Sequence, residues 1–301
     1  STHIQYSEAV YIIYLYMKVN YVNTLDSEVN RSESLKYRLE CRNGYSGNNL
    51  GKCEDYVHCN LITIPKKYSY DFAVFCQRNP NPCPLLEITE PGSTKLEETC
   101  SQDIDLRTDV PQYRVFKNGK LAYDHVSDVS EFWRDDLVSF VFGCSYSFDY
   151  ILTQQGVVQR RLLENKYAPL YLSNIPLRPS GPFKGNMVVS VRAVKKKDLD
   201  KILEITERCW FGHGSPVHWG DPSAIGIDFD KKPLNENESM DLLDDEIAIF
   251  TACGVSIEKC VTEISELDIM ISVGLEQTLV TDVKTEELFN PKRKPRLIGS
   301  D

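Results

Sequence analysis

The sequence predicts a mixed α/β protein, a single large domain with a substantial mixed sheet, and leaves a two-lobed form open. Segments with the β-branched, alternating pattern of strands recur between segments whose apolar residues fall at helical spacing. The 301 residues, 42% of them hydrophobic, are enough to bury a sizeable core. No period of about 20–50 residues recurs, so a solenoid or propeller is not expected.

We expect three parts along the chain. Residues 1–35 are rich in Tyr, Asn, Ser and Glu and read as an N-terminal extension. Residues 36–283 form the folded domain. Residues 284–301 are a polar C-terminal tail whose charge run, PKRKPR (291–296), is more typical of a solvated terminus than of a nucleic-acid arm.

The first half of the domain predicts strands and one helix. YVHCNLITI (56–64) has the pattern of a strand, and KYSYDFAVFCQRN (67–79) carries apolar residues at helical spacing. LLEIT (85–89) follows a proline-rich connection and reads as a short strand. Asn118-Gly119 lies between two alternating runs and predicts a β-hairpin.

The second half continues the alternation. Residues 137–156 mix apolar residues at helical intervals with a Gly-Cys-Ser break, and we interpret them as two helical pieces around a tight turn. MVVSVRAV (187–194) predicts a buried strand, and KKKDLDKILEITERCW (195–210) predicts an amphipathic helix. The remaining segments predict a strand, a helix and two strands at 246–254, 256–264, 267–273 and 278–283.

Charge and hydropathy exclude some partners. The net charge of −10 argues against a broad nucleic-acid or anionic-membrane surface. The longest apolar stretch, residues 9–17, is shorter than the roughly 20 residues of a spanning helix. We therefore expect no nucleic acid and no membrane as partners, and a small-molecule carboxylate substrate would have to meet a local cluster of cations. Homo-oligomer formation stays open. No cofactor is assigned.

Ten scattered cysteines without a CxxC pair suit a reducing, intracellular compartment and predict few or no disulfides. No metal site is predicted, because Cys41, Cys53 and Cys59 lack paired zinc-ligand spacing. A start at Ser1 leaves a trimmed presequence open, which would place the protein in mitochondria and otherwise in the cytoplasm.

The richest polar cluster is HGSPVHWGDP (213–222). A turn there would let the Asp221 carboxylate orient the His218 imidazole for proton transfer. The alternative is structural, with Asp221 capping a helix that begins at Pro222 and His218 bonding to backbone.

A second candidate is the Gly-Cys-Ser break at 143–145. Ser145 and nearby amides would bind an anion if they open a helix, and Cys144 would be a nucleophile if its pKa were lowered. The alternative for Cys144 is a small buried side chain in a tight turn. Gly254, between a strand and a helix, offers a similar oxyanion site, with a simple strand-end turn as the alternative.

Two arginines could bind a carboxylate. Arg192 lies within an apolar strand, where a charge must be paired or point into a pocket. Its alternative is a buried ion pair with an acid such as Asp109. Arg178, in NIPLRPSGPF, is the second candidate.

Several long motifs resemble one known family, the hydro-lyase family that includes mitochondrial D-glutamate cyclase. They are FCQRNPNPCPLLEIT (75–89), DIDLRTDVPQYRV (103–115), WRDDLVSFVFGCSYSF (133–148), NIPLRPSGPFKGNMVVSVRAV (174–194), HGSPVHWGDPSAIGI (213–227) and ACGV (252–255). The resemblance covers residues 36–283 and implies a carbon–oxygen lyase of D-amino acid metabolism, which cyclises D-glutamate to 5-oxo-D-proline and water.

The chain departs from the family pattern at four places. The family's ITHAPGH is ISVGLEQ here, so Val273 and Gln277 replace two histidines. A Thr-Ala-Gly loop becomes Asn49-Leu50-Gly51, an Arg-His pair becomes Arg160-Arg161, and an expected Arg is Leu172. These changes favour an alternative function, a catalytically weakened paralogue that binds a small carboxylate without turnover. A Cys144-dependent acyl transfer is a third hypothesis.

Overall fold

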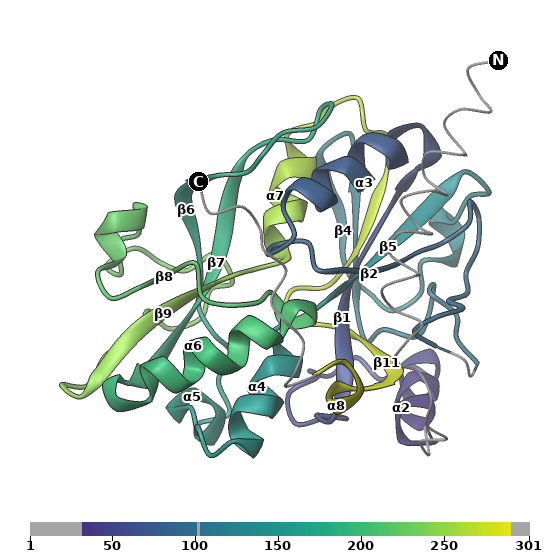
Figure 1. Ribbon diagram of the computed structural model, residues 1–301. Helices are drawn as coiled ribbons and strands as arrows, with labels where there is room; N and C mark the ends of the chain where they lie inside the picture. Colours follow the sequence, from purple (N-terminus) through teal and green to yellow (C-terminus); the bar gives the residue numbers. More distant parts are fainter. Residues whose placement is uncertain (1–31, 101–102, 290–301) are drawn as a thin grey trace.

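The computed structural model describes residues 32–100 and 103–289, which fold around two antiparallel sheets (Figure 1). The first sheet has the order β2-β5-β1-β10-β3-β4, and β11 also pairs with β1. Its strands are β1 (Tyr56–Pro65), β2 (Leu85–Ile88), β3 (Tyr113–Lys117), β4 (Lys120–Val126), β5 (Leu137–Gly143), β10 (Met270–Val273) and β11 (Leu279–Lys284). The second sheet has the order β6-β7-β9-β8, from β6 (Leu170–Pro176), β7 (Asn186–Lys195), β8 (His218–Trp219) and β9 (Glu246–Ala252). The predicted mixed α/β class is confirmed.

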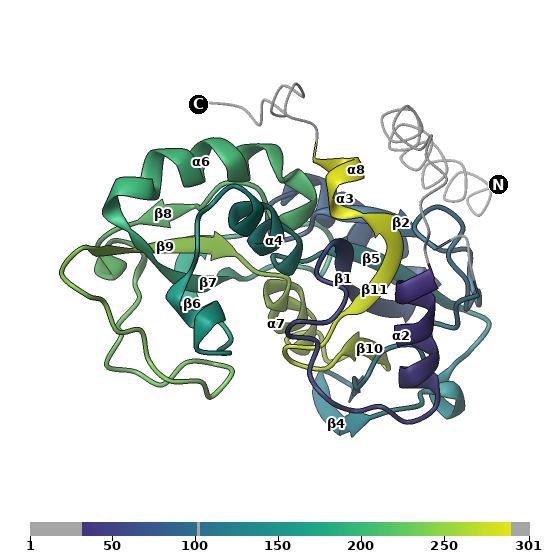
Figure 2. The ribbon, with the colours of Figure 1, turned by 90° about the horizontal axis from the view of Figure 1, so that it is seen from below.

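Helices cover both sheets, as Figure 2 shows from below. The α-helices are α2 (Ser32–Arg42), α3 (Ser69–Arg78), α4 (Tyr146–Gln154), α5 (Arg160–Leu163), α6 (Leu199–Arg208), α7 (Val255–Thr262) and α8 (Thr285–Leu288). Helix α4 packs against α6, whereas α3 and α7 contribute to a common cluster of buried side chains. No helix in the described ranges is both long and apolar enough to cross a membrane.

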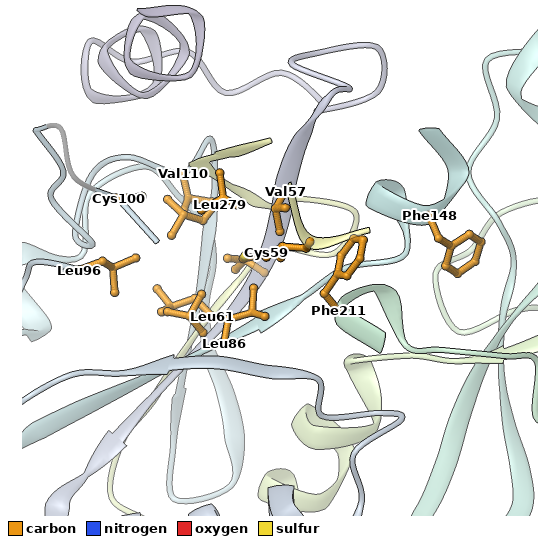
Figure 3. Packing of buried hydrophobic residues seen from close by; sticks show 14 of the residues in the cluster. Val57, Cys59, Leu61, Leu86, Leu96, Cys100, Val110, Phe148, Phe211 and Leu279 are labelled. Carbon is orange, nitrogen blue, oxygen red and sulfur yellow. The ribbon is translucent and has the colours of Figure 1, made fainter. Parts of the chain in front are cut away.

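The core consists of two large apolar clusters, and each draws on both sheets. One cluster contains Val57 and Leu61 of β1 together with Phe148 of α4 (Figure 3). The same cluster contains Ile249 of β9. The other contains side chains of β1, β5, β7 and β9 with those of α3 and α7. Because both clusters span the two sheets, the sheets are parts of one folded body.

Two parts of the chain repeat the same arrangement. Strand β1, the 3-10 helix η2 (Lys66–Tyr68) and α3 are 10, 3 and 10 residues long. Strand β7, the 3-10 helix η4 (Lys196–Asp198) and α6 have the same lengths. The partner strands β5 and β9 pair in equivalent registers, since Cys59 lies opposite Gly143 and Val189 lies opposite Ala252.

The repeat extends to the turn that leads into each following helix. A cysteine directly follows β5 and another directly follows β9. The Cys144 N–H donates to the carbonyl of His58 at 2.8 Å, and the Cys253 N–H donates to the carbonyl of Val188 at 3.0 Å. Three residues later, the hydroxyls of Ser147 and Ser256 accept the N–H groups of the same two residues, at 3.1 and 2.9 Å. Helices α4 and α7 therefore begin at equivalent points of the two sheets.

Most predicted elements are confirmed, including the hairpin at Asn118-Gly119, where both residues have positive φ as a tight two-residue turn requires. The predicted helix at the start of residues 137–156 is wrong, because Leu137–Gly143 is strand β5 and only the second piece is helical. Every residue of β5 is buried, so the strand carries no alternation of apolar and polar residues that could identify it.

Two predicted boundaries are also wrong. Helix α2 begins at Ser32 and continues past the expected domain start at residue 36. The folded domain extends beyond residue 283, because α8 follows β11 directly and the Leu288 side chain lies in the core. Residues 1–31 of the predicted extension and 290–301 of the predicted tail lie outside the described residues.

All ten cysteines are free thiols, and eight of them are buried. The prediction of few or no disulfides is thus confirmed.

Stability is expected to fall between pH 7 and pH 5 because of two buried histidines. Burial lowers the pKa of His58 to about 4 and that of His213 to about 4. The unfolded chain takes up protons below about pH 6.5, so the stabilisation is full above that pH and is lost progressively as the pH falls towards 4. At pH 5 each histidine lowers the free energy of unfolding by about 2 kcal/mol relative to pH 7.

Urea unfolding at both pH values measures this effect. His58→Gln should flatten the pH dependence, while the exposed His125 provides a control variant, His125→Gln, that should leave it unchanged. A wild-type unfolding free energy that is equal at pH 7 and pH 5 would contradict the expectation.

Candidate active site

The centre of the candidate site is the buried carboxylate of Asp149, in the first turn of α4. Arg192 Nε and Nη2 donate to its two oxygens at 3.1 and 3.2 Å. Arg161, from the short helix α5, donates to the same carboxylate, and Gln159 Nε2 donates to Asp149 Oδ1 at 2.7 Å. Ser190 Oγ accepts from Arg192 Nη1 at 2.8 Å. Three segments of the chain thus meet at one acid.

This cluster carries an excess of positive charge. Arg192 is 1% exposed, and the side chain of Arg161 is 11% exposed, yet the two guanidiniums share one carboxylate. Burial alone would raise the pKa of Asp149, but the two arginines outweigh it and hold that pKa below its usual value. Burial likewise lowers the pKa of Arg161, against the attraction of Asp149. A buried excess of one positive charge is costly unless an anion binds.

Arg192 also packs on an aromatic ring, with its guanidinium carbon 4.5 Å from the Phe148 centroid. Arg192 forms a buried ion pair, as the alternative from the sequence proposed, but the partner is Asp149. Asp109, the acid suggested from the sequence, instead pairs with Arg42 at 2.7 Å.

The start of α4 lies beside this cluster. Cys144 is partly exposed and interacts electrostatically with both Asp149 and Arg192. Burial raises the pKa of the Cys144 thiol, although the N–H of Tyr146 bonds to its sulfur and opposes the shift. The condition for a nucleophilic Cys144, a lowered pKa, is therefore not met, and the hypothesis of a Cys144 thiolate nucleophile has no electrostatic support.

Ser145 is the N-cap residue of α4, so the turn does open a helix, and the helix dipole there favours a negative charge.

The equivalent turn at α7 faces the same region. Cys253 interacts electrostatically with Cys144 and Arg192. Gly254 has no room for a side chain, because a Cβ there would lie 2.7 Å from the Asn60 amide nitrogen. Beside it, Thr251 lies opposite Ser190 in the sheet, and its buried hydroxyl has no hydrogen-bond partner among the described residues. Both helix starts and both sheets therefore contribute polar groups here.

His218 and Asp221 do not belong to this cluster. In the second sheet Phe250 lies opposite both His218 and Val191, whereas Ile249 lies opposite both Trp219 and Arg192. Directly paired residues share a face and successive residues alternate, so His218 points to the face opposite Arg192. These two candidate side chains therefore do not share one concavity.

The predicted orientation of His218 by a carboxylate is also wrong. His218 Nε2 bonds to the backbone oxygen of Asp221 at 2.8 Å, and its ring packs on Phe250. The Asp221 carboxylate instead accepts from the N–H and hydroxyl of Ser223, each at 2.9 Å. Asp221 thus caps the 3-10 helix η6 (Pro222–Ile225), which is the structural alternative.

His218→Asn is expected to leave turnover unchanged within about twofold, as for a substitution remote from the reacting atoms. Comparison of kcat/KM with that of the wild type measures this. A fall of about 10²-fold or more, typical of the loss of a general acid or base, would return His218 to the site.

Arg178 is not joined to Arg192 by any contact among the described residues. Its side chain is exposed, and its backbone is held by Asn79 at the end of α3, through bonds of 2.8 Å in both directions. The structure therefore does not bring the two predicted carboxylate-binding arginines together.

Sequence reasoning missed Asp149, Gln159 and Arg161. Asp149 lies in the first turn of α4, next to the buried Phe148. A correct assignment of residues 137–143 as a strand would have placed Asp149 in the helix that follows the end of that strand. Arg161 was noted only as a departure from a family pattern. No group of His, Cys, Asp and Glu side chains within the described ranges is arranged to hold a metal ion.

Comparisons with known proteins identify the family of this chain. The profile of the D-glutamate cyclase family matches residues 138–282, which include the Asp149 cluster and both cysteine turns. A protein of Oceanobacillus iheyensis named "Putative hydro-lyase" is 39% identical over 244 residues, which are 81% of this chain and 94% of that protein. Proteins with the same name from Bacillus licheniformis and Bordetella pertussis are 38% and 40% identical, covering 86% and 83% of this chain and 98% and 90% of their own length.

These matches extend over most of each relative. They support hydro-lyase chemistry in general terms. The chain belongs to the D-glutamate cyclase family of hydro-lyases.

Proposed function

We propose that the protein cyclises D-glutamate to 5-oxo-D-proline with release of water. The observation that carries the proposal is the excess positive charge of the Asp149, Arg161 and Arg192 cluster at the start of α4. An acidic amino acid would supply the missing negative charge. The family description supports the choice of glutamate and of its D form.

The reaction defines what the site must do. The amine nitrogen forms a bond to the side-chain carboxyl carbon, and one carbon–oxygen bond breaks. Two protons leave the ammonium group and are taken up by the departing oxygen, which becomes water. The site must therefore bind a carboxylate, hold the amine close to it and stabilise the negative charge that develops on oxygen.

The residues suit these tasks in different ways. Arg161 is the less buried of the two arginines and is the natural partner for a substrate carboxylate, while Arg192 stays paired with Asp149. The start of α4, at Ser145, would stabilise the developing oxyanion. Cys144, whose pKa is raised by burial, would be present as a neutral thiol.

The test is to incubate the purified protein with D- and L-amino acids and hydroxy acids, with and without divalent metals, and to measure loss of water by mass spectrometry. We expect D-glutamate to lose one water. If D-glutamate stays unchanged while another acid loses water, the substrate is wrong and the lyase class stands.

A second candidate is a protein that binds an acidic metabolite without turnover. Val273 and Gln277, in place of two histidines expected from the family pattern, favour it, and the buried Gln277 Oε1 lacks a hydrogen-bond partner among the described residues. Saturable binding of D-glutamate with no loss of water would establish this function.

A further inference from the structure

Glu276 presents a carboxylate that no cation in the described part of the chain neutralises. Its Oε1 accepts from Asn235 Nδ2 at 2.9 Å and from Asn237 Nδ2 at 2.7 Å. Within the described residues, Oε2 has no hydrogen bond and neither oxygen has an ion-pair partner. Glu276 is half-buried, and burial raises its pKa although the two amides oppose the shift. A partly desolvated carboxylate held in this way is suited to bind a positive group.

The local structure holds Glu276 in place from two sides. The Asn235 amide also donates to the carbonyl of Ala168 at 3.0 Å, and its oxygen accepts the N–H of Leu170 at 3.1 Å. Glu276 itself has a φ of 64°, a left-handed conformation that is unfavourable for a residue with a side chain. Such strain persists where the surrounding structure imposes it, and it is concentrated at functional sites.

Two tyrosine rings accompany this carboxylate. The Tyr146 and Tyr167 centroids are 6.1 Å apart, and the Tyr146 hydroxyl donates to the backbone oxygen of Glu276 at 3.5 Å. Both tyrosines interact electrostatically with Glu276. Aromatic rings beside a carboxylate are a typical setting for an ammonium group, which is attracted by the ring faces and by the negative charge.

Tyr146 connects this corner to the Asp149 cluster. It is the first residue of α4, and it interacts electrostatically with Arg161 and with Cys144. A ligand beside Tyr146 would therefore meet an excess of positive charge towards Arg161 and a free carboxylate oxygen towards Glu276. This polarity matches an amino acid, which carries a carboxylate and an ammonium group a few bonds apart.

We infer that Glu276, with the rings of Tyr146 and Tyr167, binds the ammonium group of an amino-acid substrate. The inference rests on the proposed function, because that function requires the amine of an acidic amino acid to be held near Arg161. It adds a specificity: the site should distinguish an acid with an amine from the same acid without one.

The experiment compares D-glutamate with glutarate, which has both carboxylates and no amine. Binding of each is measured by calorimetry to the wild type, to Glu276→Gln and to a control, Glu263→Gln, which removes an equivalent charge from an exposed position. Glu276→Gln should bind D-glutamate roughly 10–100-fold more weakly, as for loss of a charged hydrogen bond, and should bind glutarate no more weakly than the wild type. Glu263→Gln should bind both as the wild type does.

A second variant controls for a possible folding defect of Glu276→Gln. Glu276→Gly suits the positive φ, so it should retain or raise the thermal midpoint and still lose the preference for D-glutamate. Unchanged D-glutamate binding in both variants, or an equal loss for D-glutamate and glutarate, would overturn the role of Glu276 alone. Failure of the wild type to bind either acid would overturn the proposed function and this inference together.

Discussion

Arg161→Gln is expected to lower kcat/KM for D-glutamate by about 10²–10³, the loss typical of removing one preorganised electrostatic contact to the reacting group. Arg161 is the cation of the Asp149 cluster that has no acid of its own, since Arg192 makes two bonds to the same carboxylate. Without the Arg161 guanidinium, Asp149 and Arg192 remain as an ion pair with no net charge, so the fold should persist. Steady-state kinetics and a thermal melt measure the two effects.

The neighbouring arginine supplies the control for this variant. Arg160 pairs with Glu246 at 3.0 Å and bonds to the Asp241 carbonyl, away from Asp149. Arg160→Gln should therefore leave kcat/KM within about twofold of the wild type. If the two glutamine variants lose activity equally, Arg161 has no special role and the charge argument for the proposed function fails.

Asp149→Asn is expected to destabilise the protein by about 3–5 kcal/mol, because it leaves two buried guanidiniums without a counter-charge. The amide can replace some hydrogen bonds of the carboxylate but not its charge. Urea unfolding at pH 7 measures the loss. An unfolding free energy within about 1 kcal/mol of the wild type would show that the cluster is neutralised in another way.

The structural repeat offers a matched control for Asp149. Glu258 occupies the equivalent position of α7 and pairs with a single arginine, Arg114, at 2.5 Å. Burial raises the pKa of Glu258, and Arg114 also lies 3.5 Å from Asp124. Glu258→Gln leaves one arginine that keeps a second acid, so we expect a clearly smaller loss of stability than for Asp149→Asn.

Local sequence was sufficient where a conformation depends on near neighbours. Asn118-Gly119 predicts its hairpin because the turn needs two residues that tolerate positive φ. The 195–210 segment predicts α6 because its apolar residues lie on one helical face. By contrast, the sequence predicts a helix where β5 lies, since a strand buried along its whole length shows no alternation that distinguishes it.

The repeat of the two halves was not visible in the sequence. Its evidence is the shared lengths of β1 and β7 with their helices and the equivalent pairing of β5 and β9, which are properties of the backbone. Cysteine and serine recur in the two turns, but other side chains at equivalent positions differ, as at Ile62 and Arg192. Backbone hydrogen bonds tolerate such differences, so the arrangement is preserved where the residues are not.

The sequence by itself determined the mixed α/β class, most of the strands and helices, the family, and the conclusion that a charge at Arg192 must be paired or face a pocket. Only the tertiary structure decided that its partner is Asp149, that Arg161 shares this acid, and that His218 lies on the opposite face. The physical reason is that side chains alternate across a strand, so the pairing register decides which residues meet. Register and long-range ion pairs depend on segments far apart in the chain, and no local pattern encodes them.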